Sequence, residues 1–496
     1  MNTQTKTFNA NMCRILLATW LSALCLVALS TQAATITVTN TNDSGGGSLR
    51  QAIADAHNGD IVRFGITGTI TLATDELLVD KSVTINGPGS DNLTVAGSGF
   101  SRVFHVSGAV TATIAGLTIT NGCDWDGFGG GGIYNDHATL TVDKCTVSGN
   151  AVSFQGGGVY NNGSNGSATL TITNSTVSGN HAAAPYGAGN GGGIYNDGSY
   201  GSAMLTVTNS TFSNNFANLS GPSGGGAIYN DGHVGSATLT VNNSTFSGNS
   251  SYQGGAIYNN GYLGSATAAI GDTILNGSGL GANLDNLSGS VSSLGYNLSS
   301  DNGGGFLTAI GDLINTDPLL GPLQDNGGPT FTHELLAGSP AIDAGNPNFT
   351  PPPDYDQRGS GYNRVANGRM DIGAFEVQPV PPPYAGQVQP PINADGTSTF
   401  NVKRGVVPVK FNLTQGGVAT CALPPATIAV TRTAGGVIGE INESVYSGNA
   451  DTGSNFRIGS CQYVYNLNSR ALGAGTYRVD ILISGQVVGS ASFGLN

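Results

Sequence analysis

Charged residues are scarce in this sequence: Asp, Glu, Lys and Arg make up 9% of its 496 residues, against about 25% in ordinary globular proteins. Basic residues are the scarcest, with 17 Lys and Arg against 30 acidic residues and a formal net charge of −13 at pH 7. Nucleic acids and anionic membrane surfaces are bound through clustered basic side chains. This composition therefore excludes nucleic acid as a partner and makes anionic membranes poor ones.

Long apolar runs are missing after residue 33, since no later stretch approaches the roughly 20 residues of a membrane-spanning helix. Before it, basic residues precede an apolar run over residues 15–29, and residues 31–33 suit signal peptidase cleavage. A lipoprotein signal at Cys25 is the competing interpretation, but Leu24 stands where such signals carry Gly or Ala. We interpret residues 1–33 as a secretory signal peptide and expect a secreted or cell-surface protein without a transmembrane segment, extracellular or associated with the outer membrane.

Cysteines are few, and two of the six lie in the predicted signal peptide. The other four are Cys123, Cys145, Cys421 and Cys461. An even number of cysteines in an oxidising compartment predicts disulfides. We expect the pairs Cys123–Cys145 and Cys421–Cys461 because each pair falls in one predicted domain, while the other two connectivities stay open.

Glycine is abundant, at 78 residues, and it shows no three-residue period, which excludes a collagen. Apolar residues make up 39% of a chain with little charge, which argues against disorder. Self-comparison instead finds a block of the form G-[GA]-[IV]-Y-N, with tyrosines spaced by 26, 35, 34 and 29 residues. Between these blocks lies a second one, L-T-[VI]-x-x-[SC]-T-[VF]-S-x-N, at residues 140–150, 170–180, 205–215 and 239–249.

Each repeat contains three short alternating segments separated by Asn, Ser and Gly turns. Strands this short cannot bury an apolar side alone, whereas coils stacked about 4.8 Å apart pair every backbone group around a continuous interior. A β-propeller blade needs four strands in about 40 residues, more than these repeats offer. Helical solenoids are excluded because a 3.6-residue period is absent. The repeat therefore predicts an all-β parallel β-helix, one three-stranded coil per repeat.

Other segments indicate how the chain is divided. Ser48 and Gln51 form a capping-box pattern that opens a predicted helix over residues 49–57, which we place over the first coil. Consecutive prolines near residue 381 predict a stiff linker, and strand-like runs beyond it predict a small β-sandwich. The expected parts are a cap with irregular coils (34–121), regular coils (122–280), closing coils (281–376), a linker (377–383) and the sandwich (384–496).

These blocks resemble secreted bacterial right-handed β-helix proteins, in particular the G-G-A-I and F-x-x-N repeats of polymorphic outer-membrane proteins. Residues 47–53 resemble the C-S-L-R-E-A start of such proteins, with Gly47 in place of its Cys and Gln51 in place of its Glu. Further segments are similar to the choice-of-anchor Q domain (317–320, 339–345, 356–359, 371–376) and to the PxKF domain (408–411). The resemblance implies a right-handed coil, an Ig-like sandwich and a surface location.

Acidic residues at equivalent repeat positions are the weak candidates for catalysis. Asp197 and Asp231 lie in Asn-Asp-Gly of successive repeats, and stacking would bring them about 5 Å apart, as a glycoside hydrolase requires. Turn formation is the simpler interpretation, with calcium binding as another. A pectate-lyase mechanism needs a strong base, and the main repeats offer only Lys144, which we interpret as paired with Asp143 at the surface. We therefore predict no catalytic, metal-binding or cofactor site, and keep Asp197 and Asp231 as weak candidates for catalysis.

Aromatic and amide side chains recur in register and predict ladders along the β-helix. The candidate ligand-binding residues are Tyr134, Tyr160, Tyr195, Tyr229 and Tyr258. Each is followed by an asparagine. Tyrosines facing outward would offer a strip for sugar or protein contact, whereas stacked rings and amides would stabilise the coils. His137 and His233 occupy nearly matching positions but are three coils apart, about 14 Å, too far for one zinc ion.

Export, repeats, acidity and scarce basic residues favour a non-catalytic role. We predict a surface or secreted protein that presents a repetitive face for adhesion to a host or environmental surface, through glycan or protein. A polysaccharide-active lyase or hydrolase is the alternative function, and a purely structural envelope protein is the third, because one β-helix scaffold supports all of these.

Overall fold

The computed structural model describes residues 33–496 except 125–126, 128, 184–188, 219–222, 278–279, 380–382, 421–425, 442–450 and 452. The predicted signal peptide, apart from its last residue, thus lies outside the described residues. The chain forms two compact units, Met1–Pro379 and Val380–Asn496, described separately below. No helix among the described residues is long and apolar enough to cross a membrane.

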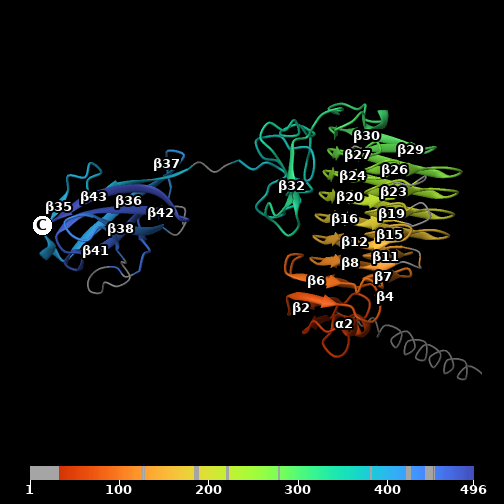
Figure 1. Cartoon of the computed structure of the whole chain (residues 1–496), viewed down its shortest axis with the longest axis horizontal. Coiled ribbons are helices and arrows are strands. Elements are labelled where there is room, and N and C mark those ends of the chain that lie inside the picture. Colours follow the sequence, from red (N-terminus) through yellow and green to blue (C-terminus); the bar gives the residue numbers. More distant parts are fainter. Residues whose placement is uncertain are drawn as a thin grey trace, which may run out of the picture. The chain divides into compact units, whose positions relative to one another are not determined.

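The first unit is a parallel β-helix made of three long sheets (Figure 1). The ten-stranded sheet contains β1 (Thr35–Val38), β2 (Ile61–Phe64), β5 (Thr84–Asn86), β8 (Thr111–Ala115), β12 (Thr139–Asp143), β16 (Ser167–Thr173), β20 (Ser202–Thr208), β24 (Ser236–Asn242), β27 (Ser265–Gly271) and β30 (Ser290–Gly295). The eight-stranded sheet contains β4 (Leu77–Val79), β7 (Phe104–Ser107), β11 (Ile133–Asp136), β15 (Val159–Asn162), β19 (Ile194–Asp197), β23 (Ile228–Asp231), β26 (Ile257–Asn260) and β29 (Leu284–Leu287). The nine-stranded sheet contains β3 (Gly68–Thr71), β6 (Leu93–Ala96), β9 (Thr118–Thr120), β13 (Thr146–Ser148), β17 (Thr176–Ser178), β21 (Thr211–Ser213), β25 (Thr245–Ser247), β28 (Ile274–Asn276) and β31 (Leu298–Ser299).

Equivalent residues of successive repeats pair directly, so the register follows the sequence repeat. Tyr160 pairs with Tyr195, and Asp197 pairs with Asp231. The conserved spacing of the second block places Leu140 and Val142 of β12 and Val147 of β13 in the interior, fully buried. The predicted all-β parallel β-helix is confirmed, and its interior is the continuous apolar core that the repeat requires.

A fourth, four-stranded sheet was not predicted. It contains β10 (Cys123–Asp124), β14 (Ala151–Val152), β18 (His181–Ala182) and β22 (Phe216–Ala217). Each of these strands has only two residues, too few to show an alternating pattern. The sheet gives the central coils a fourth side just before the glycine-rich block.

Two asparagine ladders run through the interior of the coils. In the first, each side-chain amide donates to the next carbonyl over 2.7–2.8 Å, through Asn135, Asn161, Asn196, Asn230, Asn259 and Asn286. The second ladder links the last asparagines of the other block, Asn150, Asn180, Asn215 and Asn249, over 2.9–3.0 Å. These buried amides satisfy one another and the backbone at the turns, which allows polar groups inside an apolar core.

A short helix caps the first coils. α2 (Leu49–Asp55) begins after Ser48, whose hydroxyl oxygen accepts a hydrogen bond from the amide of Gln51 over 3.2 Å. Its buried residues Leu49, Ala52 and Ile53 join the interior core. The helix ends two residues before the expected His57 because the backbone of Ala56 is already extended.

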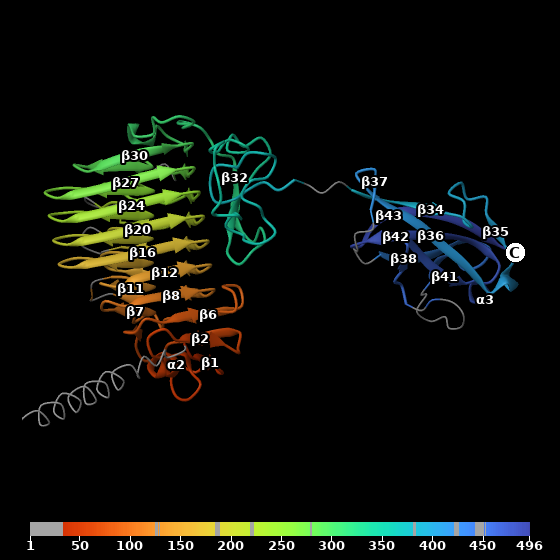
Figure 2. The ribbon, with the colours of Figure 1, turned by 180° about the vertical axis from the view of Figure 1, so that it is seen from behind.

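Beyond β31 the chain forms no further complete coils among the described residues, so the prediction of closing coils up to residue 376 is wrong in its second part. After a short 3-10 turn (η1, Gly303–Gly305), residues 317–377 instead run back along the outer face of the nine-stranded sheet. We call residues 317–377 the strap. It contains the antiparallel pair β32 (Leu320–Gln324) and β33 (Thr332–Leu335), drawn beside the stack in Figures 1 and 2.

Buried ion pairs fix the strap. Arg364 is fully buried and bonds Glu376 over 3.0 Å, and Arg358 bonds Asp356 over 2.6 Å. The Arg358 guanidinium also lies 3.7 Å from the ring centre of Phe375. Asp356, Arg358, Phe375 and Glu376 belong to the segments that resemble the choice-of-anchor Q domain, whereas Arg364 lies between two of these segments.

The second unit contains two sheets around one apolar core. One consists of β34 (Tyr384–Gln389), β36 (Val406–Gln415), β41 (Gln462–Asn468), β40 (Arg457–Gly459) and β37 (Val418–Ala419). The other consists of β35 (Thr399–Phe400), β43 (Gln486–Leu495), β42 (Gly475–Ile483), β38 (Ala426–Ala434) and β39 (Gly439–Ile441), with η2 (Val402–Arg404) and α3 (Ser469–Leu472) at the connections. Phe411, Tyr463, Tyr477 and Phe493 fill the core. The pairing is mostly antiparallel, and the Ig-like topology stays a prediction.

The predicted Cys123–Cys145 disulfide is not formed, because both cysteines are free. Cys123 lies in the four-stranded sheet, whereas Cys145 is fully buried in the interior core between β12 and β13. The Cys145 thiol lies 3.4 Å from the carbonyl oxygen of Asp143. Burial raises the pKa of Cys145 to about 12, so the thiol stays protonated. Cys421 is outside the described residues, so its pairing with Cys461 remains a prediction.

Candidate functional site

The predicted tyrosine ladder exists, but it is buried. Within each I-Y-N-D strand of the eight-stranded sheet, Ile and Asn face the interior while Tyr and Asp face the other side. The five tyrosines form a cluster of their own, with exposed fractions of 5–8% and ring centres 4.9–5.4 Å apart. Backbone from the preceding coil also packs against the ladder, since a Cβ added to Gly224, just before β23, would lie 2.7 Å from the Tyr258 ring. The ladder is therefore a second core, and its prediction as an open contact strip is wrong.

Asp197 and Asp231 lie on neighbouring strands, as the repeat predicted, but both carboxylates are engaged. Tyr160 donates its hydroxyl to Asp197 over 2.5 Å, and Tyr195 donates to Asp231. The second oxygen of Asp197 accepts the amide of Ser199 over 2.9 Å. The second oxygen of Asp231 accepts the amide of His233 over 3.0 Å and the side-chain amide of Asn260 over 2.9 Å.

These bonds give the aspartates a structural role. Each carboxylate closes its turn and fixes a tyrosine of the preceding coil. Burial raises the pKa of Asp231, and it raises the pKa of Tyr195 well above the usual value. A hydrolase needs one carboxylate free to give or take a proton and access for the sugar. Only 6% of each aspartate is exposed, so the geometry favours the turn interpretation.

The other sequence candidates do not come together. Lys144 lies 4.0 Å from Asp143 with half of its side chain exposed, as expected for a surface pair. His137 bonds its neighbour Asp136 over 2.6 Å and the carbonyl of Ser164 over 2.9 Å. No group of three or more His, Cys, Asp or Glu residues among the described part of the chain could hold a metal ion. Calcium binding stays an expectation without a site.

A charged cluster that sequence reasoning missed continues the tyrosine face toward the first coils. Glu76 accepts hydrogen bonds from Arg102 over 2.6 Å and is 2.7 Å from Nδ1 of His105. Arg102 also lies 4.8 Å above the ring of Tyr134 and 3.3 Å from Asp124. Arg102 and His105 lie in the irregular coils, where no repeated block marks them. The guanidinium of Arg102 is paired with the carboxylates of Glu76 and Asp124, so the cluster is an ion-pair network that leaves Arg102 unavailable as a catalytic base.

The charged cluster predicts a pH-dependent stability. Burial would raise the pKa of Glu76, but hydrogen bonds from His105 and Arg102 outweigh it and lower the pKa from 4.5 to about 2. Because the pKa of Glu76 is lower in the folded state, the ionised carboxylate stabilises the fold above pH 4.5, and this stabilisation is lost as the pH falls toward 2. We expect Glu76→Gln to cost on the order of 1–2 kcal/mol at pH 6 and much less at pH 3, measured by urea unfolding. Equal losses of stability at both pH values would contradict this prediction. Glu334→Gln is the control, because the Glu334 carboxylate has no ion pair among the described residues.

Exposed apolar side chains gather at the turns that join the eight-stranded to the ten-stranded sheet. We call Tyr200, His233, Val234, Tyr262 and Leu263 the corner row. Tyr200, Tyr262 and Leu263 are 63%, 49% and 70% exposed. The rings follow one another from coil to coil, with His233 stacked on Tyr262 at 5.7 Å and Tyr200 edge-on to His233 at 6.2 Å. Figure 2 shows these turns projecting at one edge of the coils, beside β20, β24 and β27.

The corner row is built at a cost in backbone energy. Tyr200, Val234 and Leu263 all have φ between 54° and 56°, in the left-handed region. Asn165 occupies the equivalent position one coil earlier with φ 57°. A side chain other than Gly or Asn costs about 1–2 kcal/mol there, and a β-branched one is a true outlier. Such outliers concentrate at functional sites, which makes the corner row the strongest candidate contact surface.

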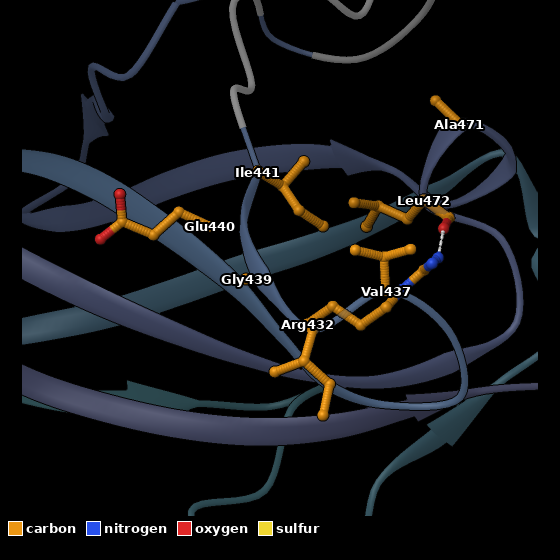
Figure 3. Close-up of a pocket in the computed structure, with 8 residues that line it drawn as sticks. Arg432, Val437, Gly439, Glu440, Ile441, Ala471 and Leu472 are labelled. Carbon is orange, nitrogen blue, oxygen red and sulfur yellow. Dashed lines mark hydrogen bonds between the residues drawn. The ribbon is translucent and has the colours of Figure 1, made fainter.

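The second unit carries a pocket of about 310 Å³ between β38, β39 and α3 (Figure 3). Its lining has two charged residues, Arg432 and the exposed Glu440. Arg432 donates to the carbonyl of Leu472 and to the hydroxyl of Tyr477. The neighbouring Val437 and Ile438 are strongly exposed. The guanidinium thus ties α3 to the sheet.

Comparison with known proteins finds similarity to parts of this chain. Residues 209–231 and 243–260, which include β21, β23, β25 and β26, match the Chlamydia polymorphic membrane protein repeat. A 67-residue part is 49% identical to probable pectate lyase C of Aspergillus flavus and of Aspergillus oryzae, covering 13% of this chain and 15% of each relative. The crystal structure of pectate lyase Pel9A aligns with 70% of this chain and 98% of its own, at 15% identity and a TM-score of 0.32.

Proposed function

We propose that this protein is an exported, surface-associated scaffold that binds an extended polysaccharide along the corner row without cleaving it. The observation that carries the proposal is the coil-by-coil row of rings on strained turns, in which the exposed Tyr200 and Tyr262 flank the half-buried His233. Aromatic side chains combine a flat apolar face with a polar tip. A sugar chain presents an apolar ring face and a hydroxyl rim at each unit, so it matches a linear series of such rings.

The strained backbone of these turns supports a role of the corner row in binding a partner. Glycine or asparagine would relieve the backbone at Val234 and Leu263. Exposed apolar residues at these positions gain little from folding, so their retention is better explained by a partner that covers them. Attachment to the cell surface is supported by the resemblance of the repeats to a membrane protein repeat.

A polysaccharide-active enzyme is the second candidate function. It is supported by the 67-residue similarity to two proteins named as probable pectate lyases. In this chain, however, Asp197 and Asp231 bond tyrosines and turns, and Lys144 is a surface charge, so these residues would have to rearrange before they could act.

The test incubates the purified protein with immobilised polysaccharides and measures both retained protein and released sugar. Retention without release supports the proposal, and Tyr262→Ala should weaken retention roughly tenfold, as loss of one central aromatic contact does. Tyr252→Ala is the matched control, because Tyr252 is 61% exposed but lies outside the corner row. Release of sugar that Asp231→Asn abolishes would favour the enzyme instead.

A second variant separates binding from folding. Val234→Gly relieves a left-handed backbone, so it should be at least as stable as the parent in thermal unfolding. We expect it to retain less polysaccharide all the same, because it removes an exposed apolar contact. Unchanged retention in both Val234→Gly and Tyr262→Ala would rule out the corner row as the binding surface.

A further inference from the structure

Threonine hydroxyls line the outer face of the nine-stranded sheet, and the strap bonds most of them. Thr176 donates to the carbonyl of Phe331 over 2.6 Å, and Thr211 donates to the side chain of Gln357 over 2.6 Å. Thr245 accepts the amide of Ala374 over 3.0 Å. At the other end of the row, Thr118 donates to the carbonyl of Ser90 over 2.6 Å. Between them stands Thr146, whose hydroxyl has no hydrogen-bond partner within the described residues.

A cavity of about 440 Å³ opens over Thr146. On one side its wall is the loop with Ser90 and Asp91, and on the other it is the part of the strap with Asp325, Pro329 and Phe331. Ser90 donates its hydroxyl to the carbonyl of Pro329, which joins the two walls. This volume lies in the range of pockets that hold small ligands, about 300–1,000 Å³.

Two carboxylates of the cavity retain unused oxygens. Asp91 accepts the side-chain amide of Asn92 through Oδ1 over 2.7 Å, and Asp325 accepts the amide of Gly327 through Oδ1 over 2.9 Å. In the part of the chain that the structure describes, Oδ2 of neither residue has a hydrogen-bond partner. The cavity therefore offers one carboxylate acceptor in each wall and the hydroxyl of Thr146 beneath it, with no basic side chain in its lining.

An aromatic ring completes the site. Phe331 is 51% exposed although its backbone is held on both sides. Its carbonyl accepts hydrogen bonds from Thr176 over 2.6 Å and from Gln357 over 3.1 Å, and Thr330 beside it donates to Asn174 over 3.1 Å. Because the Phe331 ring is already held in place and exposed beside hydrogen-bonding groups, it can bind a ligand with one apolar face while losing little conformational entropy.

We propose that this cavity binds one sugar unit that carries neighbouring hydroxyl or amino groups and no carboxylate. The sugar ring would lie on Phe331, its hydroxyls or ammonium would donate to Asp91 and Asp325, and the hydroxyl of Thr146 would complete the contacts. Uronates are disfavoured because their carboxylate would meet two like charges. The site shares its ligand class with the proposed function but none of the residues of the corner row.

The test measures binding of glucose, glucosamine and galacturonate to the full protein by ligand-observed NMR titration. We expect glucosamine or glucose to bind and galacturonate to bind at least tenfold more weakly. Asp325→Asn should weaken binding about tenfold, as loss of a bond to a charged acceptor does, and Phe331→Ala about threefold to tenfold. Phe100→Ala is the control, since Phe100 is 87% exposed and does not line the cavity.

Several results would overturn this site. They are equal or tighter binding of galacturonate, no binding of either other sugar, or full binding by both Asp325→Asn and Phe331→Ala. Tyr262→Ala separates the two proposals: it should leave binding of the single sugar unchanged while it weakens retention on polysaccharide. Loss of both by Tyr262→Ala would contradict the independence of the cavity.

Discussion

Replacing Arg364 with alanine is expected to lower the free energy of unfolding of the β-helix unit by about 3–5 kcal/mol, the usual cost of removing one partner of a buried ion pair. Arg364 has no exposed surface and lies 3.0 Å from Glu376. It also donates to the carbonyls of Asp371 and Gly373 over 2.9 Å each. Its removal leaves a buried carboxylate without a counter-ion and two carbonyls without donors.

The loss should depend on pH in a defined direction. Burial already raises the pKa of Glu376 to about 7 in the parent, against the opposing charge of Arg364. Without Arg364 the pKa rises further, and the folded state then keeps a proton that the unfolded chain loses near pH 4.5. The parent loses stability in the same way between pH 4.5 and 7, so the loss caused by Arg364→Ala should stay nearly constant up to about pH 7 and grow as the pH rises further.

Hydrogen exchange of the strap, together with urea unfolding, measures this effect locally. Arg457→Ala is the control. The Arg457 side chain is 59% exposed in its ion pair with Asp451, so its removal should change the free energy of unfolding by less than about 1 kcal/mol. Arg364→Met combined with Glu376→Gln should recover part of the loss, since no charge is left unpaired. A single and a double variant of equal stability would show that the pair is not what holds the strap.

The repeated part of the fold could be predicted from sequence because each strand recurs in register. The spacing of Tyr195 and Tyr229 fixed which strands pair, and alternation within β24 fixed which residues face the interior. The strap could not be predicted, because its contacts join residues such as Gln357 and Thr211, 146 positions apart, without any periodic pattern. Its buried arginines also contradict the usual exposure of charge.

The candidate site was likewise only partly predictable from the sequence. The sequence placed Asp197 and Asp231 side by side, yet it could not show that Tyr160 and Tyr195 would occupy their oxygens. The burial of the tyrosines depends on packing against neighbouring rings and, at Tyr258, against the backbone of Gly224, which no periodic pattern marks. The corner row gave no sequence signal, because the left-handed backbone that makes Val234 unusual appears only in three dimensions.

The second large effect is expected inside the first asparagine ladder, where Asn196→Ala should cost about 2–4 kcal/mol. Asn196 accepts from Asn161 and donates to Asn230, each over 2.7 Å, in a fully buried site. Alanine leaves one donor with a weaker partner, one acceptor with none, and a cavity between them. A buried group left without a partner costs about 1–3 kcal/mol, and lost packing adds to it.

Asn135→Ala is the matched control, because it removes the first member of the same ladder. The carbonyl oxygen of Asn135 has no partner among the described residues, since Val106 occupies the paired position on β7. Its loss deprives Asn161 and the carbonyls of Ala138 and Thr169 of a donor, but it leaves no donor without its partner and removes an acceptor that was already unsatisfied. We therefore expect a cost smaller by about 1 kcal/mol or more than that of Asn196→Ala, measured by urea unfolding.

Val106→Asn tests whether the open acceptor is a property of the ladder or of this coil. An asparagine there would donate to Asn135, but its own carbonyl would become the unpaired end. The unfolding free energy should then change little, apart from the lost apolar burial of Val106. A clear gain in stability would mean that the new carbonyl finds a partner in the irregular coils. In a ladder where every amide donates in one direction, adding members moves the unpaired acceptor and does not remove it.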